Sequence, residues 1–178
     1  LIEPIEKEIR KRLGVHVYGV NSTTLEEELV RLLLERKYTI SLAESCTGGM
    51  ICSRLVNCSG VSQVLIEGAV TYSNDAKKRR LGVKSETLEQ YGAVSEETAR
   101  EMAIGIAKAA QTDISLSATG FAGPEGGSQE KPVGLVYISI YYHGKVKVRK
   151  CKFSGTRQQI RERVTIEALD WLRQELLK

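Results

Sequence analysis

The sequence predicts a three-layer α/β domain with a mixed sheet and a C-terminal antiparallel hairpin. Hydrophobic periodicity and turn signals place the elements in the order α-β-α-β-α-α-β-β-β-α, and strands that alternate with helices are typical of parallel pairing. The last two strands are separated only by His143 and Gly144, and this short connection indicates an antiparallel hairpin. Because parallel strands are covered by helices on both faces, we expect three layers.

The composition is that of one soluble globular domain with a short extra segment. The chain has 178 residues, of which 42% are hydrophobic and 27% charged, and only 3 are Pro; this excludes a disordered, collagen-like or low-complexity polymer. The longest apolar run is far shorter than the ~18 residues of a membrane span. Residues 1–22 have mixed charge and lack the apolar core of a secretory signal. We therefore expect a cytoplasmic protein that has no membrane partner.

Residues 1–22 are predicted to be a connector that follows an N-terminal domain of a longer protein. They combine an amphipathic stretch with a Gly-punctuated one, and the first residue is Leu, not Met. The domain proper, 23–178, is expected to start at residues 24–27 (TLEE), which have the pattern of a capping box. The first helix then runs to about Lys37.

Two strands, each followed by a turn and a helix, are predicted next. Residues 39–43 (TISLA) form a buried strand, and the turn at 44–49 (ESCTGG) leads directly into a helix. A strand-turn-helix unit of this kind aims backbone amides at an anion. Residues 63–72 form the second strand, and a helix capped by Ser73 extends through Leu81.

The middle of the domain is predicted to contain a long helix, a strand and a long loop. A short helix ends at Gly92, and Ser95 caps a longer helix whose apolar stripe consists of small residues, so we expect it to pack closely on the sheet. Residues 113–119 form a strand that leads into the Gly-rich loop 120–131. Long loops in compact domains are commonly functional.

The C-terminal part is predicted to be a hairpin and a helix. The hairpin joins strands 133–142 and 145–153, and the last helix runs from about 156 to 177. The alternation of apolar residues in the second strand changes parity, which predicts a β-bulge near Arg149 and Lys150.

A ligand site is expected where three turns meet. The turns at 44–49, 72–77 and 119–127 each follow a predicted strand, and open α/β sheets bind ligands at the carboxyl ends of their strands. Ser45 is the candidate nucleophile, because the amides that follow it could stabilise an oxyanion. The alternative is that Ser45 only caps the following helix.

Lys77 is the candidate base for this serine. His16 lies in the connector and His143 at a hairpin tip, so neither histidine is well placed. The positive end of the helix dipole and the cationic neighbours at 78–80 should lower the pKa of Lys77, as a general base requires. The alternative is a solvated lysine in a basic run.

Other polar residues in these turns suit a ligand site. Tyr72 could orient the ligand and Thr119 could donate a hydrogen bond to the reacting group, although both could be structural. Arg157 could form a charge-assisted bond with a phosphate, or it could be a surface arginine. Cys46 is a rival nucleophile that ranks below Ser45, because no histidine is placed to activate it.

Metal and cofactor sites are not expected. The four Cys include no C-x-x-C pair and there are only two His, so reduced thiols are favoured over a zinc site or a disulfide framework. Residues 145–163 hold eight basic residues against one acidic residue. This block suits an anionic ligand or a nucleic-acid backbone, or it is a solvated strand and helix face.

Five motifs, in order and at matching spacing, resemble the CinA C-terminal domain family over about residues 24–177. They are AESCTGG at 43–49, YSN at 72–74 with Lys77, GAVS at 92–95, TG at 119–120 with AGP at 122–124, and KPVG at 131–134. Residues 1–22 resemble the connector of full-length CinA, whose N-terminal domain is molybdopterin-binding-like.

The resemblance implies a metal-independent amidohydrolase of pyridine nucleotide salvage, which converts nicotinamide mononucleotide to nicotinic acid mononucleotide and ammonia. Ser45 would be the nucleophile and Lys77 the base, while Tyr72 and Thr119 would support them. No cofactor is implied. The predicted substrate contacts are Thr47, Gly48, Gly49, Asn74, Gly120, Gly123 and Arg157.

Two departures from the family pattern leave alternatives open. Thr156 stands where the family usually has Asp, and Phe121 where Ile is usual. One alternative is a nucleotide-binding regulatory module without turnover. Binding of nucleic acid through 145–163 ranks last, because Phe153 is the block's only aromatic residue and no reading motif is present. The small-residue stripe and the edge hairpin favour a homo-oligomer.

Overall fold

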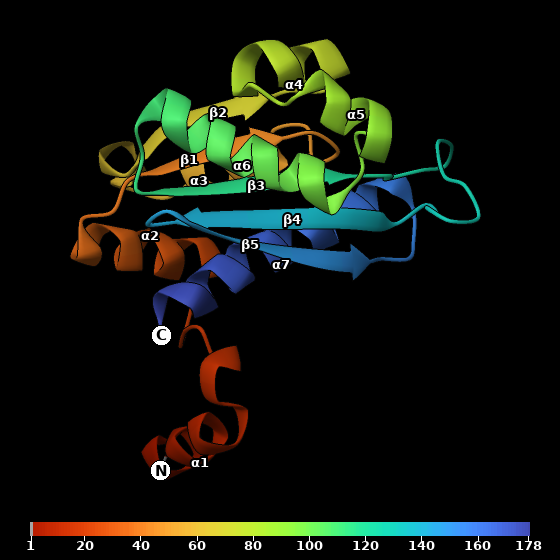
Figure 1. Cartoon of the computed structure of the whole chain (residues 1–178). Coiled ribbons are helices and arrows are strands. Elements are labelled where there is room, and N and C mark those ends of the chain that lie inside the picture. The colour runs from red at the N-terminus through yellow and green to blue at the C-terminus, as the bar shows by residue number, and fades with distance from the viewer. Residues whose placement is uncertain (1) are drawn as a thin grey trace.

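A five-stranded mixed sheet forms the centre of the molecule in the computed structural model, which describes residues 2–178 (Figure 1). The strand order is β2-β1-β3-β4-β5; β1 pairs in parallel with β2 and β3, and the remaining pairs are antiparallel. The predicted mixed sheet and C-terminal hairpin are therefore confirmed. The strands are β1 (Ile40–Glu44), β2 (Leu65–Val70), β3 (Ile114–Gly120), β4 (Leu135–Tyr142) and β5 (Lys145–Lys152).

Helices cover both faces of the sheet and complete the three predicted layers (Figure 1). The larger apolar core lies between the sheet and the first layer, and a smaller cluster lies beneath the second. The first layer consists of α2 (Leu25–Arg36), α3 (Met50–Val56) and α7 (Arg157–Leu176). The second consists of α4 (Asn74–Leu81), α5 (Ser85–Tyr91) and α6 (Glu96–Ala110).

Helix α6 packs closely on the sheet, as its small residues predict. The hydroxyl of Ser115 donates to the carbonyl of Ala103 at 2.6 Å, and that of Ser117 donates to the carbonyl of Ala99 at 2.7 Å. These hydroxyls are fully buried, so their bonds to the helix backbone satisfy groups that would otherwise be costly to bury. The small-residue stripe of α6 thus packs against the sheet of its own domain. The predicted homo-oligomer stays a prediction.

We expect Gly105→Ala to destabilise the domain. A Cβ at this position of α6 would lie 1.9 Å from the carbonyl oxygen of Leu81 at the end of α4. The gain in helix propensity is only ~1 kcal/mol, whereas overpacking against backbone costs about 1–3 kcal/mol or more. Urea unfolding should show a net loss of stability, while the control Lys108→Ala, on the exposed side of α6, should change little. Equal stability of Gly105→Ala and wild type would contradict this packing.

The predicted β-bulge near Arg149 and Lys150 is wrong, because β4 and β5 pair in one continuous register. The change of parity has another cause: β5 is an edge strand, and different helices cover its two faces. Arg100 of α6 donates to the carbonyl of Val146 at 3.3 Å, whereas the guanidinium of Arg149 lies 4.5 Å from the ring centroid of Trp171 in α7. Half-buried side chains therefore occur on both faces.

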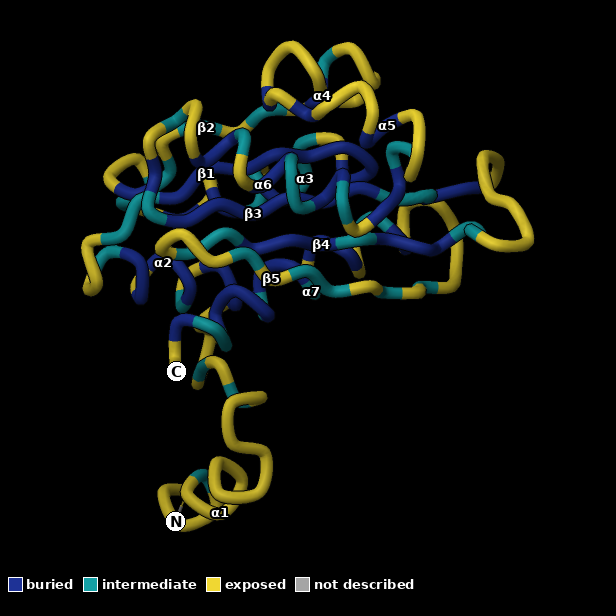
Figure 2. The backbone as a smooth tube through the Cα atoms, in the orientation of Figure 1, coloured by how far each residue is buried: buried dark blue, intermediate teal, exposed yellow. Residues whose placement is uncertain are grey.

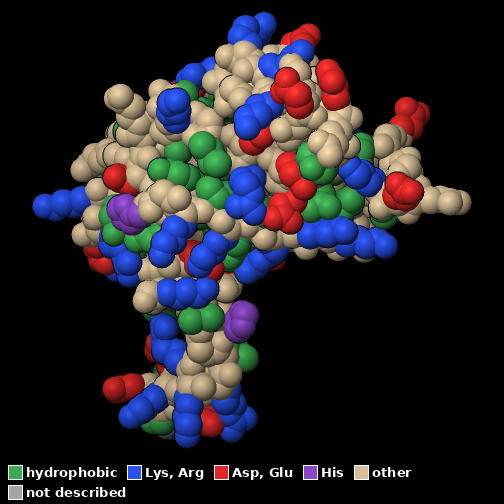
Figure 3. All heavy atoms as spheres, viewed as in Figure 1, with side chains coloured by type: hydrophobic (Ala, Val, Ile, Leu, Met, Phe, Trp, Pro, Cys, Tyr) green, Lys and Arg blue, Asp and Glu red, His purple; other side chains and the backbone are tan. Residues whose placement is uncertain are grey.

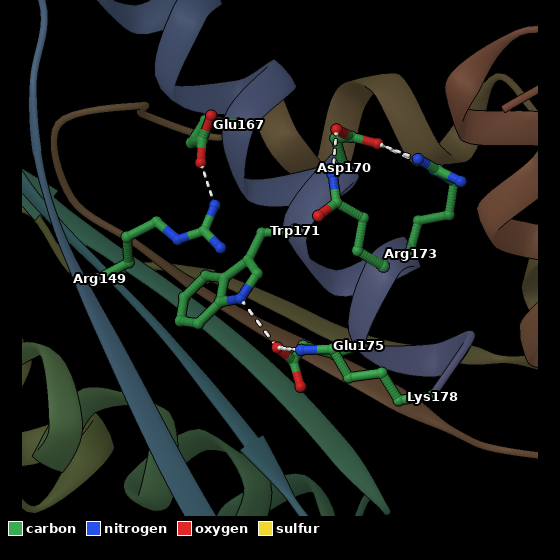
Figure 4. A network of polar contacts seen from close by, with 8 residues as sticks. Arg149, Glu167, Asp170, Trp171, Arg173, Glu175 and Lys178 are labelled. Atoms are coloured by element: carbon green, nitrogen blue, oxygen red, sulfur yellow. Dashed lines mark hydrogen bonds and ion pairs between the residues drawn. The ribbon is translucent and has the colours of Figure 1, made fainter. Parts of the chain in front are cut away.

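The segment before α2 extends away from the domain (Figures 1 and 2). It contains α1 (Glu3–Leu13), which has no buried residue, and the short 3-10 helix η1 (Gly14–His16). The buried side chain of Arg173 in α7 joins it to the domain by donating to the carbonyl of Val15; Figure 4 shows the same guanidinium paired with Asp170. None of the described helices has the length and apolarity needed to cross a bilayer.

Candidate active site

The carboxyl ends of β1, β2 and β3 lie at one edge of the sheet, as the strand order requires. The turns after these strands enclose a cavity of about 190 Å³. A cavity therefore lies where the ligand site is predicted, and its role as that site stays a prediction. It is lined by Ser45, Cys46, Tyr72, Lys77, Ala93, Val94, Thr119, Gly120, Phe121, Ala122 and Arg157.

Ser45 and Lys77 meet in this cavity. The Nζ atom of Lys77 lies 3.1 Å from the Oγ atom of Ser45, and it donates to the carbonyls of Thr71 at 2.9 Å and Tyr72 at 3.3 Å. The exposed fraction is 1% for Lys77 and 8% for Ser45. The structure thus rules out the solvated alternative for Lys77, and two carbonyls fix its amine beside the serine hydroxyl.

Burial lowers the pKa of Lys77. One of the two predicted causes, the cationic neighbours at 78–80, is wrong: burial is what lowers this pKa, and carboxylates compensate two of those charges, since Lys78 pairs with Asp75 at 2.8 Å and Arg80 pairs with Glu67. No ion pair joins the Lys77 amine to a carboxylate within residues 2–178. The loss of hydration is therefore not compensated by an opposite charge, and the neutral amine is favoured.

Cys46, the rival nucleophile, is held in its thiol form. Burial raises the pKa of its thiol to about 12, so the nucleophilic thiolate is scarce at neutral pH. This electrostatic difference favours Ser45, whose hydroxyl contacts the Lys77 amine directly.

Ser45 does not cap the helix that follows it, so the capping alternative is wrong. The carboxylate of Glu44, at the end of β1, accepts hydrogen bonds from the amides of Gly49 at 2.9 Å, Ile51 at 3.2 Å and Cys52 at 2.8 Å. These amides belong to the N-cap and first turn of α3, where backbone amides have no acceptor within the helix. Glu44 therefore anchors the turn and leaves the Ser45 hydroxyl to Lys77.

Replacing Glu44 should destabilise the fold. Glu44 is 1% exposed, and leaving one buried and two part-buried amides without their charged acceptor should cost about 3 kcal/mol or more. We expect urea unfolding of Glu44→Ala to show this loss and Glu44→Gln to be intermediate. Glu86→Ala, at an exposed position in the first turn of α5, is the matched control and should stay within about 0.5 kcal/mol of wild type. A similarly small change in Glu44→Ala would contradict the anchoring role.

Arg157 joins two turns at the mouth of the cavity. Its Nη2 donates to the hydroxyl of Tyr72 at 2.8 Å, and its Nη1 donates to the carbonyl of Gly123 at 2.7 Å. Tyr72 is 60% exposed, so this contact lies at the surface. A guanidinium held in this way keeps other N–H groups for an anionic ligand.

Thr156, which departs from the family pattern, caps α7. Its hydroxyl accepts from the amide of Gln159 at 3.3 Å, and the side chain of Gln159 accepts from the amide of Thr156 at 2.9 Å. This reciprocal pair is a capping box. Threonine thus supplies the N-cap that an aspartate would supply, while Arg157 is oriented by Tyr72 and Gly123.

Thr119 supports the opposite wall of the cavity. Its hydroxyl is almost fully buried and donates to the carbonyl of Ala93 at 2.7 Å, which fixes the segment between α5 and α6. The Thr119 hydroxyl proton, which was predicted to form a hydrogen bond with the reacting group, is therefore bound to Ala93 instead. The lone pairs of the hydroxyl oxygen stay available as acceptors. A supporting role fits this geometry better than proton donation.

Several predicted substrate contacts do not line the cavity. The amide of Gly48 donates to the carbonyl of Ser45 at 3.1 Å, and the Gly49 amide is bound by Glu44. Gly120 lines the cavity, whereas Gly123 offers its carbonyl to Arg157. The substrate roles of these residues remain predictions. The predicted contacts outside the lining are Thr47, Gly48, Gly49, Asn74 and Gly123.

Sequence reasoning missed the roles of Glu44 and Arg161. An acidic residue directly before a Gly-rich helix start is a signal for an anchored N-terminus, and this signal was present for Glu44. Arg161 lies four residues after Arg157, and therefore on the same face of α7, and it donates to the carbonyl of Thr47. The spacing alone could not identify that partner.

The basic block at 145–163 is partly neutralised by acidic residues of α7. Arg149 pairs with Glu167, as Figure 4 shows, and Lys147 pairs with Glu175. On the face in Figure 3, acidic side chains lie among the basic ones. This mixture supports the lowest rank for nucleic-acid binding. Within residues 2–178, no group of three or more His, Cys, Asp or Glu could hold a metal ion.

The family model for the CinA C-terminal domain matches residues 22–176. The chain belongs to the CinA C-terminal domain family. A Clostridium beijerinckii relative, whose name describes it as competence-damage inducible, is 61% identical over 178 residues, which are all of this chain and 43% of that protein. A CinA-like protein of Kosmotoga olearia is 58% identical over 177 residues, with 99% of this chain and 43% of that protein covered. The chain therefore spans less than half the length of these relatives.

Solved CinA structures share the fold. A CinA superfamily protein from Klebsiella pneumoniae superposes with a TM-score of 0.84 at 33% identity, covering 86% of this chain and 96% of that one. The competence/damage inducible protein CihA from Agrobacterium tumefaciens gives 0.81 at 38% identity, with 90% and 100% covered. The three-layer architecture is thus the CinA fold.

Proposed function

We propose that this CinA domain is an amidohydrolase that converts nicotinamide mononucleotide to nicotinic acid mononucleotide and ammonia. The observation that carries the proposal is the 3.1 Å contact between Lys77 Nζ and Ser45 Oγ inside a cavity. A buried hydroxyl beside an amine whose pKa is lowered is the arrangement of an activated serine nucleophile.

The first half of the reaction is acylation of Ser45. A neutral Lys77 has two N–H bonds, which suit the carbonyls of Thr71 and Tyr72, and one lone pair, which can accept the serine proton. The Ser45 oxygen attacks the carboxamide carbon while its proton moves to Lys77, and an oxyanion forms. When the C–N bond breaks, Lys77 returns the proton to the nitrogen, so that ammonia leaves and an ester remains.

The second half is hydrolysis of this ester. Lys77, again neutral, takes a proton from a water molecule as the water oxygen attacks the acyl carbon. The bond to Ser45 then breaks, and the serine oxygen regains a proton from Lys77. The carboxylic acid that is released loses its proton to solvent and becomes the carboxylate. Ser45 and Lys77 thus supply the nucleophile and the proton transfers of both bond-breaking steps, so the proposed reaction needs no metal.

The size of the cavity favours a substrate that is only partly enclosed. Its volume of about 190 Å³ is smaller than the ~300 Å³ from which ligand pockets usually start. The carboxamide-bearing ring would occupy it, while the ribose and phosphate would lie at the mouth. Arg157 lies there and is the cation placed to meet the phosphate.

The test is incubation of the purified chain with nicotinamide mononucleotide, followed by assays for ammonia and nicotinic acid mononucleotide. The proposal expects both products in equal amounts. The alternative, a nucleotide-binding regulatory module, expects the nucleotide to raise the melting temperature without release of ammonia. That second outcome would replace the enzymatic proposal.

A further inference from the structure

Arg161 links α7 to the turn that carries Ser45. Its Nη2 and Nε atoms donate to the carbonyl of Thr47 at 2.7 and 3.3 Å. A Cβ on Gly48, which has φ +61°, would lie 3.2 Å from the same guanidinium, so a side chain there would crowd it. The Thr47 carbonyl is the one hydrogen-bond partner of the Arg161 side chain within residues 2–178.

This contact is the start of a chain of two peptide groups. The Thr47 carbonyl that accepts from Arg161 belongs to the same peptide group as the amide of Gly48. That amide donates to the carbonyl of Ser45 at 3.1 Å. The Ser45 carbonyl in turn belongs to the same peptide group as the amide of Cys46.

The chain ends at the amide of Cys46, which donates to no other residue within residues 2–178. Cys46 lines the cavity next to Ser45. The Ser45 amide, by contrast, is bound to the carbonyl of Ala118 at 2.9 Å. Hydrogen bonds that follow one another polarise each other, so a cation at one end makes the last N–H a stronger donor.

We propose that Arg161 is a positioning residue, which orients and polarises these two peptide groups so that the Cys46 amide stabilises the oxyanion formed when Ser45 attacks a carboxamide. The inference rests on the proposed function. It adds the Cys46 amide as the oxyanion donor and Arg161 as the residue that polarises this donor. Arg161 itself does not touch the substrate.

The position of the turn does not depend on Arg161 alone. Glu44 binds three amides at the start of α3, and Lys77 holds the hydroxyl of Ser45. Removing the Arg161 charge should therefore leave the fold and the Ser45–Lys77 contact in place. The effect should fall on the transition state, where the oxyanion exists, and hence on kcat rather than on KM.

The test compares Arg161→Gln, which keeps N–H donors without the charge, with Arg161→Lys, which keeps the charge. Loss of a whole oxyanion donor costs ~10²–10³-fold in kcat, and weakening of one should cost about 10-fold. We expect this loss in Arg161→Gln, with KM within about 3-fold and an unchanged pH midpoint of activity, and we expect Arg161→Lys to restore most of kcat. The control is Arg163→Gln, because Arg163 is exposed and donates to the carbonyl of Ser154. Neither of these residues lines the cavity.

Three outcomes would overturn the inference. A wild-type value of kcat in Arg161→Gln would show that the charge of Arg161 does not contribute to stabilising the oxyanion. A low kcat in both Arg161 variants, together with a shifted pH midpoint, would show that Arg161 only keeps Ser45 and Lys77 in place. Absence of ammonia release by the wild-type protein in the same assay would refute the proposed function and the inference with it.

Discussion

Ser45→Ala should release ammonia from nicotinamide mononucleotide at least about 1,000-fold more slowly than the wild-type protein, because the variant has no oxygen to form the acyl intermediate. The fold should persist, since the Ser45 hydroxyl contacts Lys77 and takes no part in the Glu44 anchor at the start of α3. The measurement is the rate of ammonia release at saturating substrate, with circular dichroism to confirm folding.

A second serine controls for the substitution itself. Ser53 lies in α3, close to the site in sequence, and is exposed. Ser53→Ala should therefore keep wild-type activity. If Ser45→Ala retained more than about one hundredth of the activity, water or another group would be the nucleophile, and the assignment of Ser45 would be wrong.

Lys77→Met should lose activity to a similar extent. Methionine fills a similar space but has no lone pair basic enough to accept the serine proton, and general-base steps contribute about 10²–10⁴-fold. Lys78→Met is the matched control, because Lys78 is the next residue on α4 and its amine is exposed and paired with Asp75. Equal activities of the two variants would contradict the role of Lys77.

The pH profile of the activity proposed for the wild-type protein should report the same amine. The ordinary pKa of a lysine is 10.5, and burial lowers that of Lys77. Only the neutral amine accepts a proton, so kcat/KM should rise with pH through a midpoint below 10.5 and level off above it. A profile that is flat, or that falls with rising pH over this range, would show that activity does not require deprotonation of Lys77.

The order of helices and strands along the chain followed from sequence, because alternation, glycine and capping residues act locally, and the general rule for open α/β sheets then placed the three turns at one end of the sheet. The turn at 44–49 and the helix capped by Ser73 needed no knowledge of distant contacts. The hairpin across His143 and Gly144 was predictable for the same reason.

The features that the sequence did not predict depend on tertiary packing, that is, on which helices cover which strands and side chains. The apparent bulge in β5 reflects two helices that cover its opposite faces. The lowered pKa of Lys77 comes from burial, which neighbours in sequence do not reveal. Thr47 and Arg161 are 114 residues apart, and no local pattern joins them. That residues 1–22 connect to another domain stays a prediction.

The central claim is that Ser45 carries the acyl group, and trapping that group tests it most directly. The wild-type protein, mixed with nicotinamide mononucleotide and quenched in acid within one turnover, should gain a covalent nicotinate mononucleotide, located by mass spectrometry on the peptide that contains Ser45. The adduct should be absent from Ser45→Ala. Ammonia release at the wild-type rate with no adduct, or with an adduct on another residue, would contradict the account.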